Sequence, residues 1–216
     1  MKSYSIFRIA ETIRIILFMT LSIIVFDFYP ITALMIILLA LLNDIPVLMI
    51  AYDRTPVDTS PVRWNMPEIL TLSSMLGVVG VIASFLLFFL LREHGFSDEM
   101  IRSMLFLKLI VAGHSTLYIT RAKGWFWQRP WPAPLLFAAT FGTEIIGTLI
   151  VVYGFLVAPI GWKYALWIWG YCLAWFLFND TVKIVTYRFI SQRDKSSQKS
   201  LLLSNREDFR QNSGNA

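Results

Sequence analysis

The sequence predicts an all-α membrane protein, a bundle of six transmembrane helices with both termini in the cytoplasm. Of its residues, 56% are hydrophobic and only 15% are charged, well below the ~25% charged residues of soluble domains. The mean hydropathy is +0.62, and the chain has eight Trp and 17 Phe, which suit lipid-exposed surfaces with aromatic belts. Its apolar runs reach about 20 residues, enough to cross a bilayer core of ~30 Å.

The first predicted span covers about residues 3–27. It begins with Lys2 and Arg8 and could be mistaken for a signal peptide. No small-residue cleavage site follows the apolar run, and Asp27 to Pro30 have the composition of a tight turn. We therefore expect a retained helix that leads through this turn into a second span at about residues 31–52.

Four more spans are predicted, at about residues 68–91, 99–120, 135–157 and 161–189. Gly77 and Gly80 in the third span permit close contact between helices. The loop before the fifth span is basic and rich in Trp and Pro, which is typical of an interfacial loop. Residues 1–190 are thus predicted to form one transport domain, and the polar residues 191–216 a disordered cytoplasmic tail.

The basic residues predict the orientation of the bundle. Six spans place both termini on one side of the membrane. Nearly all Lys and Arg outside the spans fall on that side, against only Arg92, Arg102 and Lys163 on the other. By the positive-inside rule, the side with the termini is cytoplasmic.

Several classes of function have no support in the sequence. Cys172 is the single cysteine, which excludes an internal disulfide framework and a thiolate metal cluster. No basic and aromatic face for nucleic acid occurs outside the apolar runs. There is also no metal-ligand spacing, no Gly-rich phosphate loop and no nucleophile–base pair. We therefore predict no catalytic residue, no metal ligand and no nucleic-acid partner.

Asp44 in the second span is the first candidate for function. An ionised Asp at a helix centre costs roughly 2.5–3.5 kcal/mol on insertion scales, so an acid there is by default a functional-site hypothesis. Pro46 follows closely and frees the carbonyl of Leu42 from its helix partner, which leaves a backbone acceptor one turn from the acid. Asn43 is a further candidate ion-binding residue beside Asp44. The alternative is an Asp–Pro kink that serves packing only.

Arg14 is the predicted partner of Asp44. If the first two spans form an antiparallel hairpin about the Asp27–Pro30 turn, both residues lie about 21–24 Å from it and so at nearly the same depth. A buried carboxylate beside a cation could load and release a proton as the distance between them changes. The alternative is that Arg14 pairs with Glu11, one turn away on its own helix.

The other polar residues in the spans are weaker candidates. Glu144 lies about 15 Å into the fifth span and is, with Pro46 and Glu11, a candidate residue of an ion pathway. Lys108 could pair with Glu144, and a lone His such as His114 is more often a packed residue than a ligand. Asp180 is expected to pair with Lys183 one turn on.

Several short segments, taken in order, carry a resemblance to a known family: Tyr4-Ser5-Ile6, Thr12-Ile13-Arg14, Leu41-Leu42-Asn43-Asp44, Ala51-Tyr52-Asp53-Arg54, Ile119 to Trp125 with Arg129-Pro130, Ile160-Gly161-Trp162, and Asn179-Asp180 to Arg188. Together they resemble the P-type plasma-membrane proton ATPases. The likeness covers about residues 2–190 and corresponds to the last six of the family's ten membrane helices.

The resemblance implies that Asp44 carries the transported proton and that Arg14 discourages its re-protonation from outside. The chain departs from the family just beyond the acid. Plant members have Gly and fungal members Val in place of Ile45, and Pro46 is not shared. A single acid at the site favours the proton over larger cations, whose sites usually gather several oxygens.

Two functions follow as hypotheses. The first is the transport segment of a proton-exporting pump in the plasma membrane. The family's Asp-Lys-Thr-Gly-Thr and Thr-Gly-Glu strings do not occur here, so ATP and Mg²⁺ are expected only with soluble domains outside this sequence. Candidate partners are then the bilayer, the proton, the N-terminal half of a pump or another copy of the chain. The second hypothesis is a non-enzymatic membrane protein, either a passive conduit or a partner of a complete pump.

Overall fold

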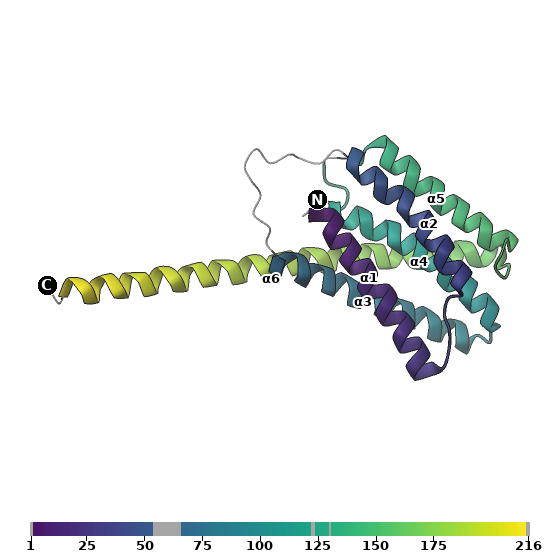
Figure 1. Cartoon of the computed structure of the whole chain (residues 1–216), viewed down its shortest axis with the longest axis horizontal. Helices are drawn as coiled ribbons and strands as arrows, with labels where there is room; N and C mark the ends of the chain where they lie inside the picture. The colour runs from purple at the N-terminus through teal and green to yellow at the C-terminus, as the bar shows by residue number, and fades with distance from the viewer. Residues whose placement is uncertain (1, 54–65, 122–123, 130, 215–216) are drawn as a thin grey trace.

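The computed structural model describes residues 2–53, 66–121, 124–129 and 131–214, and in these ranges the protein is all-helical. Six α-helices and one short 3₁₀ turn follow one another along the chain (Figure 1). Their bounds are α1 Lys2–Phe26, α2 Ala33–Met49, η1 Ile50–Tyr52, α3 Met66–Glu93, α4 Asp98–Arg121, α5 Pro134–Tyr153 and α6 Gly161–Gly214.

Five of the helices, α1 to α5, are long and apolar enough to cross a membrane. Their positions agree with the first five predicted spans to within a few residues. The largest difference is at the end of α5, which stops at Tyr153 because Gly154 caps the helix in the left-handed conformation (φ 75°). The chain is thus a multi-pass membrane protein. α6 contains the sixth predicted span but is not among the five helices found apolar enough over the described residues, so a sixth crossing and the cytoplasmic termini remain predictions.

α6 continues as one helix to Gly214 and extends well beyond the bundle (Figure 1). The sequence predicts a disordered tail from Ser191, so the structure differs there. Residues 191–213 contain neither Pro nor Gly, so no strong helix breaker interrupts the helix there.

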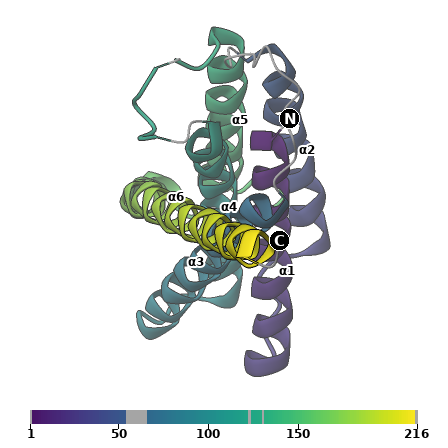
Figure 2. The same ribbon diagram turned by 90° about the vertical axis from the view of Figure 1, so that its left-hand side faces the viewer.

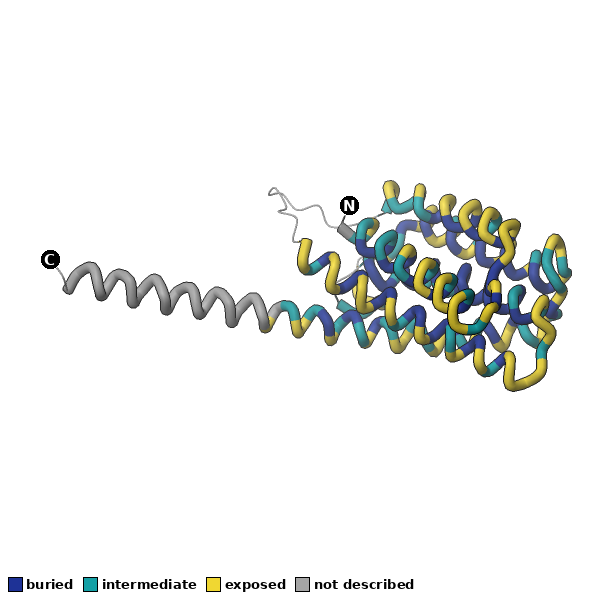
Figure 3. Tube along the Cα trace, turned by 60° about the horizontal axis from the view of Figure 1, so that its bottom comes forward, coloured by how far each residue is buried: buried dark blue, intermediate teal, exposed yellow. Residues whose placement is uncertain are grey.

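α4 is the central helix and contacts every other α-helix. Its burial is far greater than that of α1 and α2: 83% of its apolar window is buried, against 28% for each of the other two. The outward faces of α1 and α2 carry apolar residues such as Ile24, Ile37 and Leu48 (Figure 3). Such a surface suits lipid or a protein partner within the membrane.

α1 packs along α3, and small residues allow a close approach as predicted. A Cβ added at Gly77 would lie 2.8 Å from the side chain of Ile13, and one at Gly80 would lie 2.7 Å from Cδ of Arg14. Side chains on α1 therefore occupy the space that these glycines leave.

The expected hairpin of α1 and α2 is wrong. The two helices are joined through residues 27–32, where Asp27 has a φ of 47°, but they diverge. α1 packs chiefly on α3 and α2 chiefly on α5, with α4 in contact with both. Figure 2 shows α2 beside α5, while α1 extends below both of them.

Candidate ion-binding site

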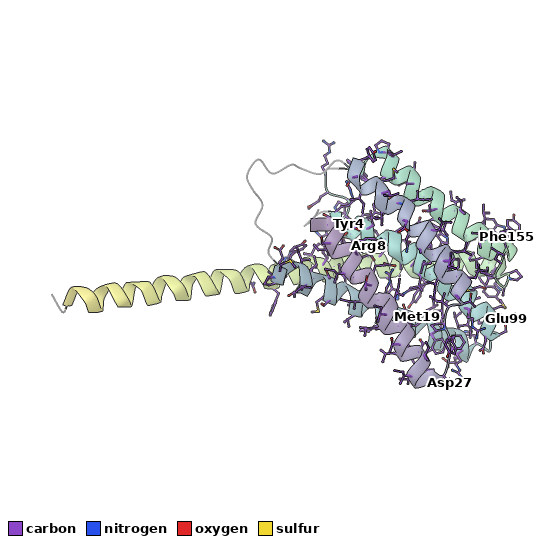
Figure 4. All side chains as sticks on the ribbon, viewed as in Figure 1. Tyr4, Arg8, Met19, Asp27, Glu99 and Phe155 are labelled. Carbon is purple, nitrogen blue, oxygen red and sulfur yellow. The ribbon has the colours of Figure 1, made fainter. Side chains whose placement is uncertain are left out.

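Asp44 lies on the outward face of α2, where it is exposed, and its partner is Arg8. The Arg8 Nη2 donates to Asp44 Oδ1 at 3.4 Å, and both side chains remain about half exposed in this chain. The guanidinium of Arg8 also lies 6.0 Å from the ring centre of Tyr4. Figure 4 shows Arg8 and Tyr4 on the N-terminal half of α1, at the opposite end of the helix from Asp27.

Arg14 is buried and pairs with Glu11 through Nη2 and the Glu11 Oε2. Its Nη1 donates to Thr116 Oγ1 on α4 at 3.3 Å. The predicted Arg14–Asp44 pair is therefore wrong, and the alternative pair on α1 is confirmed. Arg14 therefore does not control proton binding at Asp44 through a direct ion pair.

The depth of the two helices explains this difference. The predicted hairpin requires that both helices begin at the same height beside the turn. Arg8 lies about 27 Å along α1 from Phe26, whereas Asp44 lies about 16 Å along α2 from Ala33. Residues 27–32 are not helical, and this extended segment takes up the difference of roughly 10 Å.

Asn43, one residue before Asp44, turns into the bundle and is buried. A Cβ added at Gly113 of α4 would lie 3.5 Å from Asn43 Oδ1 and 3.4 Å from both Glu11 Oε1 and Arg14 Nη2. Three polar groups from α1 and α2 thus surround one point against the backbone of α4. We call Glu11, Arg14, Asn43 and Gly113 the mid-bundle cluster.

The mid-bundle cluster leaves hydrogen-bonding capacity unused. Glu11 Oε1, Arg14 Nε and Asn43 Oδ1 are all buried without a hydrogen-bond partner among the described residues. Such groups cost on the order of 1–3 kcal/mol each when they are left unpaired. Their presence together is unusual in a packed core and identifies the cluster as a candidate site.

Lys108 and His114 bring further charge or polarity into the same bundle. The Lys108 ammonium donates to Ser84 Oγ at 2.5 Å and to the Gly80 carbonyl at 3.3 Å, so the suggested pairing with Glu144 is wrong. Glu144 instead lies 3.5 Å from His114 Nδ1, with both side chains buried. Neither ring nitrogen of His114 has a hydrogen-bond partner among the described residues.

Pro46 is buried within α2, which continues past it to Met49 before tightening into η1. The helix therefore does not end at the proline. No finding tests the roles assigned to Pro46, Glu11 and Glu144 in an ion pathway or to Asp44 as the ion-binding acid, and these roles remain predictions. Across the described ranges, no group of three or more His, Cys, Asp or Glu gathers as a metal site would.

A second polar network lies at the end of the bundle where α4 ends and α5 begins. Asp53 accepts hydrogen bonds from Arg121 Nε at 2.5 Å, from Arg121 Nη2 at 2.9 Å and from the backbone N–H of Ala133 at 3.0 Å. Sequence reasoning did not propose this pair. The only available signal was that both residues lie within the family-like segments.

The same end network includes Asp180 and Lys183, whose predicted pair is confirmed at 2.6 Å. Lys183 also donates to the carbonyls of Ile119 and Gly124 at 3.1 and 2.6 Å. Asp180 Oδ2 accepts from the backbone N–H of Phe126 at 3.1 Å. These bonds fasten the loop after α4 to α6. We call Asp53, Arg121, Asp180 and Lys183 the end network.

Comparison with known proteins shows which class of protein this sequence is similar to. The chain is 51% identical over 187 residues to a putative cation-transporting ATPase of Methanocaldococcus jannaschii, covering 86% of this chain and 23% of that protein. It is 31% identical over 158 residues to plasma membrane ATPase 1 of Saccharomyces cerevisiae, and the alignment covers 71% of this chain and 17% of that protein. A probable plasma membrane ATPase of Dictyostelium discoideum is 27% identical over 220 aligned residues, and the alignment covers 87% of this chain and 20% of that protein.

The chain is therefore homologous to the membrane region of P-type cation-transporting ATPases, the class that the sequence motifs indicate. It spans about a fifth of the length of these curated relatives. No family model matches it.

Proposed function

We propose that this chain is the membrane transport segment of a P-type ATPase that exports protons across the plasma membrane, with Asp44 as its proton-binding carboxylate. The single observation that carries the proposal is an acid within a membrane-length helix, in a chain homologous to cation-transporting ATPases. An acid at such a depth is costly and is therefore, by default, a candidate functional residue. Arg8, at 3.4 Å, takes the role of the nearby cation that was first assigned to Arg14.

The outward position of Asp44 is part of the proposal. The α1–α2 face combines this acid with exposed apolar side chains, among them Leu41 and Leu48. The relatives are about five times longer than the aligned region. We propose that further membrane helices of the pump cover this face, so that Asp44 opens onto a pathway between them and this chain, and that the soluble domains supply ATP and Mg²⁺ binding.

Charge favours a proton as the cargo. Arg8 lies 3.4 Å from Asp44, and Arg14 pairs with Glu11, so each of these two acids already has a guanidinium partner. A metal cation at Asp44 would meet the positive charge of Arg8 and few further oxygens, whereas sites for metal cations usually gather six or more. A proton requires only the carboxylate itself.

The test is co-expression of this chain with a polypeptide that supplies the phosphorylation and nucleotide-binding domains, reconstituted in liposomes. ATP-driven acidification of the lumen is expected for the natural sequence, and Asp44→Asn is expected to abolish it. Glu93→Gln is the control, because Glu93 is an exposed carboxylate at the end of α3. Transport that survives Asp44→Asn would refute the carrier assignment. Proton flux through this chain alone would favour the passive conduit.

A further inference from the structure

The mid-bundle cluster has the geometry of a small binding site rather than of a closed ion pair. Three groups face one point: Glu11 Oε1 and Asn43 Oδ1, which are acceptors, and Arg14 Nη2, which is a donor. Glu11 and Asn43 are each only 5% exposed, and both of these oxygens lack a hydrogen-bond partner among the described residues. They come from two helices that diverge elsewhere, and α4 brings them together.

Gly113 keeps this point free of side-chain atoms. A methyl group there would lie 3.4–3.5 Å from all three polar atoms, which is ordinary contact and not a clash. No other side-chain atom outside the neighbouring residues comes closer to this point, and a water in contact with the Gly113 Cα would lie somewhat farther out, on the side of the three polar atoms. A single water molecule fits such a place, because buried waters typically make about three hydrogen bonds to otherwise unsatisfied groups.

The partners match the chemistry of water. A water molecule has two O–H donors for the two acceptor oxygens, and one of its lone pairs can accept from Arg14 Nη2. A metal cation matches less well, since the guanidinium would repel it and only two protein oxygens converge. An anion is disfavoured by those same two oxygens.

We propose that a water molecule binds at Gly113 between Glu11, Asn43 and Arg14, and that Glu11 exchanges a proton through it during transport. In this step the water gives a proton to Glu11 Oε1 and takes one from a hydronium ion of the transport pathway, so that Glu11 becomes neutral and the hydronium ion becomes water. The inference rests on the proposed function for the exchange, but the water site itself does not.

Glu11 is well placed for this role relative to Asp44. Asp44 follows Asn43 directly on α2, and Arg8 lies one turn from Glu11 on α1. Two carboxylate–guanidinium pairs, Asp44 with Arg8 and Glu11 with Arg14, therefore succeed each other from the outward face of α2 into the bundle. The other titratable groups near the cluster are Lys108 and His114 of α4 and Glu144 of α5, whose own contacts lie with Ser84 and with each other.

The water site is tested by infrared spectroscopy of the full chain in lipid nanodiscs, comparing ordinary water with water labelled with heavy oxygen. Bands of bound water shift with the label. Gly113→Ala is expected to remove one such band, since its methyl group occupies the site without a clash. Gly142→Ala is the matched control, because an added Cβ there meets nothing within 4 Å, and it is expected to keep the band. A band that persists in Gly113→Ala would overturn the proposal.

The proton exchange is tested separately in the reconstituted pump. Glu11→Gln should keep the water band, since the amide still accepts a hydrogen bond, but reduce ATP-driven proton transport by about tenfold or more. Gly113→Ala should reduce both. Unchanged transport in Glu11→Gln, with the natural sequence active, would overturn the role of Glu11. If the natural sequence transports no proton, the proposed function fails, while the infrared result still decides the water site.

Discussion

The end network and the mid-bundle cluster both hold buried charges, but they satisfy them differently. In the end network, both Asp53 oxygens accept hydrogen bonds from Arg121, one of them also from Ala133, and Lys183 donates to two carbonyls. In the mid-bundle cluster, Glu11 Oε1 and Asn43 Oδ1 are buried without a hydrogen-bond partner among the described residues, whereas Asp180 Oδ1 of the end network, also without such a bond, lies 2.6 Å from the Lys183 ammonium. The difference suggests that the first set fixes a loop, whereas the second keeps capacity for a ligand.

Asp53→Ala should have the largest effect on stability. It leaves Arg121 buried without its carboxylate and the Ala133 N–H without an acceptor, which is expected to lower the free energy of unfolding by about 3–5 kcal/mol. Denaturant titration in mixed micelles would measure this loss. Glu93→Ala, on an exposed residue, is the control. A loss below 1 kcal/mol would remove the structural role assigned to the end network.

Gly80→Ala is expected to have the next largest effect. The added Cβ would lie 2.7 Å from Arg14 Cδ, so the packing of α1 on α3 must shift, at a cost of about 1–3 kcal/mol. The matched variant is Gly170→Ala, where an added Cβ has open space and the higher helix propensity of Ala should stabilise the protein slightly. Equal stabilities for the two variants would contradict the close approach of Arg14.

Thr116→Val removes the hydroxyl that accepts from Arg14 Nη1 at 3.3 Å. Because the bond involves a charged donor, we expect a loss of about 1.5 kcal/mol, again from denaturant titration. Thr181→Val is a suitable control, since its exposed hydroxyl donates only to the carbonyl one turn back on α6. A much larger loss at Thr116 would mean that the mid-bundle cluster serves stability after all.

Asp44→Ala is expected to have the smallest effect on stability, below about 1 kcal/mol, because the side-chain bond of Asp44 to Arg8 is long, at 3.4 Å, and hydrogen bonds weaken with distance. Its effect on proton transport should nevertheless be complete. A small loss of stability together with a complete loss of transport, both measured on one preparation, would show that the Asp44 charge serves function and not stability. A destabilisation as large as that of Asp53→Ala would mean that the Arg8–Asp44 pair is structural, as the end network is.

The sequence was sufficient to predict the helices but not the rotation of α2. Length, hydropathy and turn residues located the boundaries of α1 to α5, because these depend on local composition. Asn43 and Asp44 differ by one residue, yet one faces the bundle and the other does not. α2 is apolar on nearly all sides, so no polar stripe marks its inner face, and packing against α4 and α5 decides which residue turns inward.

The partners of Arg14 and Asp53 were also beyond sequence reasoning, for different reasons. The depth of Arg14 relative to α2 depends on the path of residues 27–32, which composition does not specify. The Asp53–Arg121 pair joins residues far apart in sequence, and only the packing of the helices brings them together. By contrast, Asp180 and Lys183 lie on one helix, where the spacing alone predicts contact.

The contact between Gly80 and the stem of Arg14 limits how this arginine can move. Its Cδ already occupies the gap that the missing side chain of Gly80 leaves, so the aliphatic part is confined between two helices. Only the planar head beyond that carbon can then rotate to exchange acceptors. Breaking its simultaneous bonds to Glu11 and Thr116 would then be a local torsional event that requires no sliding of α1 along α3.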